Sequence, residues 1–145
     1  MFNFIKTKEK NKMNILYKQP FDAINGCCDV SLSSTDCFNY ILKIQFNDQK
    51  TGEKKQILLT FERCDGMKHT LSYHIRDWDN LDHYEQLIEI ENSTWIKQVY
   101  NGLEKSKATK TEYKLASKLK HYAISFEDHG HFEFLAMNCI IEQQP

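Results

Sequence analysis

The sequence predicts an α+β fold in which an antiparallel β-sheet of about five to six strands packs against one main α-helix. Three observations indicate this fold: segments in which apolar and polar residues alternate, short polar turns between those segments, and one stretch with the apolar spacing of a helix. The chain is expected to form a single domain over residues 13–145, preceded by a flexible basic tail at residues 1–12.

The composition is typical of a globular domain. Of the 145 residues, 41% are hydrophobic and 27% are charged, and these values argue against a wholly disordered chain. The formal net charge of -1 favours neither nucleic acid nor an anionic membrane as a partner. No apolar run approaches the roughly 18 residues that are needed to span a bilayer. We therefore expect neither nucleic acid nor a membrane as a partner.

Cysteine usage predicts the compartment. The chain has five cysteines, an odd number, and its N-terminal segment lacks the long apolar run and small-residue cleavage site of a secretory signal. Reduced thiols are therefore expected rather than a disulfide framework, which favours a cytoplasmic protein.

The strongest strand pattern lies at residues 38–46, where large apolar side chains alternate with mostly polar ones: Phe38, Tyr40, Leu42, Ile44 and Phe46. Residues 56–61 repeat the alternation after a polar turn, so the two segments are predicted to form a hairpin. A third strand is expected at residues 70–75. The first ordered element is expected near residues 14–17, and a short strand at residues 86–90.

One main helix is predicted near residues 94–105. Ser93 is a suitable N-cap, and the following apolar residues fall on one helical face: Trp95, Ile96, Val99, Tyr100 and Leu103. A second short helix is expected around Tyr113 and Leu119. The chain then forms a hairpin of strands at residues 121–126 and 131–141. The second of these strands is apolar on both faces, so we expect it to be central and covered on both sides, with the helix on one of them.

Cysteine and histidine clusters suggest an enzyme as the alternative. Four cysteines could supply thiolate ligands to a zinc ion, but they lack the paired spacing of a structural zinc site: Cys27, Cys28, Cys37 and Cys64. The histidine clusters match no known ligand spacing: His69 with His74, and His129 with His131. Neither Cys64 nor Cys139 has a neighbouring base or helix N-terminus that would activate its thiol. We therefore predict no catalytic residue, no metal and no cofactor, with a small Cys/His-dependent hydrolase or metal-binding enzyme as the alternative.

Charge is segregated along the chain although its sum is near zero. Six acidic residues fall within Asp77–Glu91 and six lysines within Lys105–Lys120. One interpretation is two solvated faces beside a helix. The functional interpretation is an acidic patch with central aromatic side chains that steers and anchors a basic partner. The predicted partner-binding residues are Asp77, Trp78, Asp79, Asp82, Tyr84 and Glu85.

Several short segments resemble small bacterial immunity proteins of polymorphic or contact-dependent growth-inhibition toxin systems. Residues 93–96, STWI, open the helix; residues 120–122, KHY, lead a strand that pairs with residues 132–136, FEFLA; and residues 21–25 read FDAIN. The resemblance implies a cytosolic, non-enzymatic inhibitor that binds and neutralises one cognate toxin domain, for example a nuclease. A third alternative is an adaptor domain that binds a partner by sheet-edge pairing.

Overall fold

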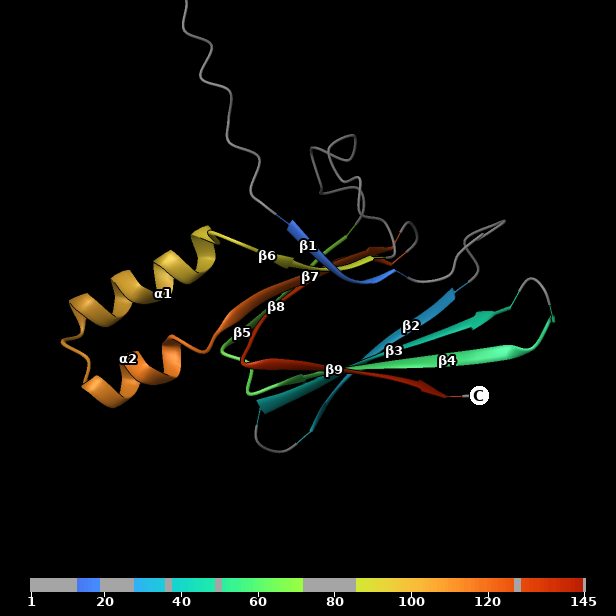
Figure 1. Ribbon diagram of the computed structural model, residues 1–145, viewed down its shortest axis with the longest axis horizontal. Helices are drawn as coiled ribbons and strands as arrows, with labels where there is room; N and C mark the ends of the chain where they lie inside the picture. The colour runs from blue at the N-terminus through green and yellow to red at the C-terminus, as the bar shows by residue number, and fades with distance from the viewer. Residues whose placement is uncertain are drawn as a thin grey trace, which may run out of the picture.

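The computed structural model describes residues 13–18, 28–35, 38–48, 51–71, 86–126 and 129–144. In these ranges the chain forms nine strands in two antiparallel sheets and two helices (Figure 1). Sheet A contains, in spatial order, β1 (Met13–Lys18), β6 (Gln86–Ile90), β7 (Lys120–Phe126), β8 (Gly130–Ala136) and β5 (Gly66–Thr70). Sheet B contains β2 (Cys28–Thr35), β3 (Asn39–Asn47), β4 (Lys54–Glu62) and β9 (Asn138–Gln144).

The core lies between the two sheets. Alternate residues of β3 and β4 are buried on the side that faces sheet A, and Phe61 of β4 stacks on Phe134 of β8 with ring centroids 3.8 Å apart. The antiparallel α+β class is therefore confirmed, but the prediction of one sheet against one helix is wrong. The reason is physical: each sheet has an apolar inner face, and the two faces bury each other, so no helix is needed as a cover.

The predicted hairpin in the N-terminal half is confirmed. β3 and β4 pair antiparallel with Leu42 opposite Leu59 and Ile44 opposite Ile57. β1 and β6 also match the elements that were expected near residues 14–17 and 86–90. The third strand begins earlier than the strand expected at residues 70–75, because β5 runs from Gly66 to Thr70. Residues 72–75 lie outside the described ranges.

The C-terminal strand predicted at residues 131–141 is two strands in different sheets. β8 ends at Ala136, and after Met137 the chain enters β9 of sheet B. Backbone hydrogen bonds hold this crossing, because the Met137 N–H donates to the Glu62 carbonyl at 2.9 Å and the Asp65 N–H donates to the Leu135 carbonyl at 2.8 Å. The sequence looks apolar on both faces because the segment contains two strands. Even-numbered residues face the core in β8, whereas odd-numbered residues face it in β9.

The two helices stand at one end of the sandwich (Figure 1). α1 (Thr94–Lys105) is capped by Ser93, and α2 (Lys110–Ala116) is capped by Thr109. The expectation that the main helix covers the sheet is wrong for most of its length, because only its first turn packs on sheet A, where the Trp95 ring meets His121. Neither helix in the described ranges is long and apolar enough to cross a membrane.

Candidate functional site

The predicted acidic patch lies outside the described residues. This holds for Asp77, Trp78, Asp79, Asp82, Tyr84 and Glu85, so their role stays a prediction. The lysines of the basic stretch do lie within the described ranges and are all exposed, along the end of α1, α2 and the start of β7.

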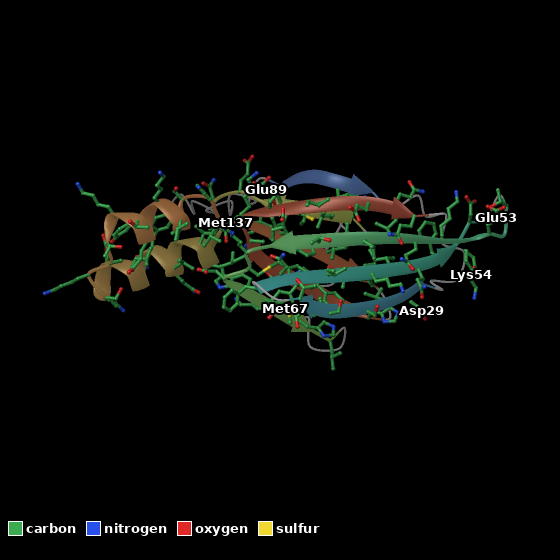
Figure 2. All side chains as sticks on the ribbon, turned by 90° about the horizontal axis from the view of Figure 1, so that it is seen from below. Asp29, Glu53, Lys54, Met67, Glu89 and Met137 are labelled. Atoms are coloured by element: carbon green, nitrogen blue, oxygen red, sulfur yellow. The ribbon has the colours of Figure 1, made fainter. Side chains whose placement is uncertain are left out.

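An apolar groove lies where the helix pair meets the end of the sandwich. Its volume is ≈ 540 Å³, and its lining is mostly apolar, with Leu103 of α1 and Leu115 of α2 among the residues on the helical side. Figure 2 shows Met137, another lining residue, at this helical end of the sandwich, and Glu53 and Lys54 at the opposite end. We call this hollow the helical-end groove and define it by Phe38, Arg63, Leu103, Leu115, Leu119 and Met137.

Phe38 is the most exposed large apolar side chain in the described ranges, with 79% of its surface accessible. The alternation of residues 38–46 predicts it on the core face, and that prediction is wrong for this one residue. Its φ angle of 61° places it in the left-handed region just before β3 begins, so its side chain does not follow the strand's alternation.

Arg63 faces Phe38 across the end of the β3–β4 pair and has the same unusual backbone conformation, with φ of 50°. The backbone ties the two positions together: the Cys64 N–H donates to the Phe38 carbonyl at 2.9 Å, and the Arg63 N–H donates to Asn39 Oδ1 at 2.9 Å. Left-handed conformations cost free energy for residues other than glycine and concentrate at functional sites. Both strained residues line the helical-end groove.

A second cluster lies on the outer face of sheet A, and we call it the polar network: Ser93, His121, Glu133, His131 and Ser125. Ser93 Oγ lies 2.7 Å from His121 Nδ1, and His121 Nε2 lies 2.9 Å from Glu133 Oε1. His131 Nε2 lies 3.7 Å from Glu133 Oε2, and its Nδ1 lies 2.5 Å from Ser125 Oγ. The carboxylate only accepts hydrogen bonds, so each histidine presents an Nε2–H group to Glu133, and its Nδ1 atom lies toward a serine hydroxyl.

Glu133 is held as a carboxylate by its two histidines. Burial alone would raise its pKa, but hydrogen bonds and charge interactions with His121 and His131 outweigh burial and hold the pKa well below its ordinary range. Ser93 is only 4% exposed, and its Oγ also accepts the Ile96 N–H as the N-cap of α1. The polar network therefore joins the start of α1 to sheet A.

Cys64 and Cys139, the two cysteines whose side chains the structure describes, are free thiols. Burial raises the pKa of Cys64 to about 11 and that of Cys139 to about 12, so both thiols stay protonated at neutral pH. His69 Nε2 lies 2.7 Å from the His129 carbonyl, and the His69 ring stacks on Phe132. Within the described ranges no group of three or more potential ligands is arranged to hold a metal ion. His74, Cys27 and Cys37 lie outside those ranges, as does the side chain of Cys28.

Comparisons of the chain with protein-family models, with curated proteins and with solved structures gave no match.

Sequence reasoning missed both Phe38 and Arg63 as candidate site residues. No short-range signal separates an exposed aromatic residue before a strand from the first core residue of that strand. It also missed the polar network, because its members come from three elements that only the sheet pairing brings together: Ser93 from the cap of α1, and the remaining four from β7 and β8.

Proposed function

We propose that the protein is a non-enzymatic inhibitor of the immunity type, which acts in the cytosol and neutralises a cognate toxin domain by binding it at the helical-end groove. One observation carries this proposal: a 79% exposed phenylalanine is held in a strained backbone conformation at the rim of an apolar groove. A residue of that kind contributes little to folding, whereas an aromatic anchor contributes strongly to a protein interface.

The composition of the groove supports a protein partner. Aromatic residues and arginine are the residue types that most often dominate binding energy, and Phe38 and Arg63 stand together at the rim. Leu115 on the helical side is 41% exposed, and the exposed charged residues Asp65 and Glu112 line the groove beside its apolar residues. An apolar centre inside a polar rim is the usual arrangement of a protein interface.

The acidic patch completes the proposal. Its carboxylates would attract a toxin surface that is positive because its substrate is negatively charged, as in nucleases, and Trp78 and Tyr84 would bury against it. Inhibition of this kind needs no bond to be made or broken by the inhibitor.

The test uses Phe38→Gly, because glycine removes the anchor and relieves the left-handed strain at the same time. We expect affinity for the toxin domain, measured by titration calorimetry, to fall at least about tenfold while the free energy of unfolding is unchanged or higher. Lys107→Gly is the matched control, because Lys107 also has a left-handed φ of 52° but does not line the groove. It should leave affinity unchanged. Wild-type affinity in Phe38→Gly would remove the groove from the interface.

A serine hydrolase is the second candidate function. The hydrogen bonds run in the order serine, histidine, carboxylate, and a cavity of ≈ 470 Å³ is lined by Ser93 and His121. In such a mechanism the Ser93 hydroxyl would attack an acyl carbon and pass its proton to His121 Nδ1, and His121 would give that proton to the alcohol or amine that leaves as the acyl bond breaks. The burial of Ser93 and its capping role place this candidate second. Labelling by a fluorophosphonate that is lost in Ser93→Ala would favour the hydrolase, and absence of labelling in the wild type would exclude it.

A further inference from the structure

β9 is an edge strand without the usual protection. In the part of the chain that the structure describes, it pairs with β4 on one side and with no strand on the other. Natural edge strands usually carry lysine, proline or a bulge that prevents pairing with another chain. β9 reads NCIIEQQ, and its register with β4 runs without interruption from Asn138 to Gln144. Among the described residues, no strand therefore takes up the backbone donors and acceptors on the free side of β9.

Two isoleucines at the middle of this edge are exposed on opposite faces of the sheet. Ile140 is 40% exposed on the outer face, and Ile141 is 39% exposed although it points to the side of the core. An added strand would cover both side chains, because neighbouring strands bring opposite residues within about 5 Å.

A ladder of amide side chains crosses the outer face of sheet B and ends at this edge. Gln45 Nε2 donates to Gln56 Oε1 at 3.2 Å, and Gln56 Nε2 donates to Gln144 Oε1 at 2.7 Å. The ladder therefore ends on the amide N–H₂ group of Gln144, a donor. An occupant of the edge that presents an amide oxygen opposite Gln144 would extend the ladder.

We propose that the occupant is β9 of a second copy of this chain, paired antiparallel about a two-fold axis at Ile141. In this register Asn138 of the copy lies opposite Gln144. The side chain of Asn138 already donates through Nδ2 to Glu62 Oε1 at 3.2 Å, which leaves Oδ1 as the amide atom that can accept from Gln144 of the copy. Gln144 Nε2 of one copy then donates to Asn138 Oδ1 of the other copy, in the same direction as the hydrogen bonds of the ladder.

Charge selects the same register. Glu142 is the one charged residue of β9, and an axis at Ile141 places it opposite Ile140 of the copy. An axis at Glu142 would bring two carboxylates face to face, which destabilises strand pairing. An axis at Ile140 would place Asn138 opposite Glu142 and leave Gln144 without a partner. The resulting homodimer joins two copies of sheet B into one continuous sheet.

The contact is small, because one strand of seven residues pairs on each side. Interfaces below about 1,200 Å² are usually weak and transient, so the dimer should form reversibly as concentration rises from micromolar to millimolar. This inference stands apart from the proposed function, since it uses a different edge of the molecule and needs no toxin.

Sedimentation velocity over that concentration range, with the full chain, tests the proposal. Ile141→Lys and Ile141→Glu should each weaken dimerisation at least about tenfold, because each places like charges opposite one another at the axis. An equimolar mixture of the two variants should form heterodimers, because lysine then faces glutamate. Leu71→Lys is the matched control, since Leu71 is 43% exposed at another part of the surface, and it should dimerise like the wild type.

Heterodimer formation in the mixture would also show that both Ile141 variants are folded. A wild type that stays monomeric at millimolar concentration would overturn the proposal. So would Ile141→Lys that dimerises like the wild type, or a mixture that remains monomeric when the wild type dimerises.

Discussion

Glu133 is the residue on which the polar network depends, because it faces two histidines at once. Its side chain is 21% exposed, and its interactions with His121 and His131 are made to the charged form. Hydrogen bonds to a charged group contribute about 1.5–3 kcal/mol. Glu133→Gln should therefore lower the free energy of unfolding at neutral pH by about that amount, measured by urea denaturation. The exposed Glu53→Gln is the control and should change little.

The pH dependence of this contribution follows from the lowered pKa of Glu133. A carboxyl group with a lower pKa in the folded state adds stability above its unfolded pKa of about 4.3, and loses it as the pH falls toward the folded value. The stability difference between the wild type and Glu133→Gln should therefore shrink between about pH 5 and about pH 2. A stability difference that stays constant over this pH range would show that the charge of the Glu133 carboxylate does not stabilise the fold.

Lys107 has a left-handed backbone conformation for a local reason. It follows the C-terminal end of α1, where the Lys107 N–H donates to the Glu104 carbonyl and the Ala108 N–H donates to the Leu103 carbonyl. This pattern of hydrogen bonds ends many helices and is usually built with glycine. Lys107→Gly should raise the free energy of unfolding by about 0.5–1 kcal/mol, measured by thermal or urea denaturation. A destabilised variant would show that the lysine side chain has another role.

At the scale of elements, alternation and capping predicted the strands and the helix that have a full apolar stripe and a clear end signal. β3, β4 and α1 are examples. β2 was not predicted, since its serine-rich sequence shows only Val30 and Leu32 as apolar members that pack on the core. The crossing at Met137 was not predictable either, because alternation within a strand does not state which sheet the strand joins.

The residues of the candidate site were less predictable than the elements. The polar network needs β7 and β8 to pair so that Glu133 lies between His121 and His131, and no local spacing indicates such pairing. The exposure of Phe38 depends on a backbone conformation that most aromatic residues avoid.

The junction between α1 and sheet A rests on close contact between Gly66 and the Trp95 ring. A Cβ added at Gly66 would lie 2.7 Å from Trp95 Cζ2, whereas a Cβ added at Gly102 within α1 would meet nothing within 4 Å. Gly66→Ala should therefore destabilise the protein by about 1–3 kcal/mol. Gly102→Ala should stabilise it by about 1 kcal/mol, because alanine favours the helix. Urea denaturation of the pair tests this, and equal effects would contradict the packing described for Trp95.

At the scale of the whole molecule, the acidic patch predicts how a partner approaches. Asp77→Lys combined with Asp79→Lys should weaken binding of the toxin domain and slow its association, more at low salt than at high salt. Stopped-flow kinetics at two ionic strengths measures this. The matched control is Asp29→Lys combined with Glu53→Lys, since these acidic residues lie in β2 and directly before β4 (Figure 2), outside the predicted patch. An association rate that is unchanged at low salt would remove the patch from the encounter surface.

The proposed function is tested most directly by protection of growing bacteria. The chain is co-expressed with the variable C-terminal domain of a large secreted protein encoded by the neighbouring gene, and growth is measured. We predict that the wild type restores growth, that Lys107→Gly restores it equally, and that Phe38→Gly does not restore it although it accumulates to the same level. Growth arrest in the presence of the wild-type chain, or a neighbouring operon of metabolic enzymes with no such toxin, would contradict the assignment as an immunity protein.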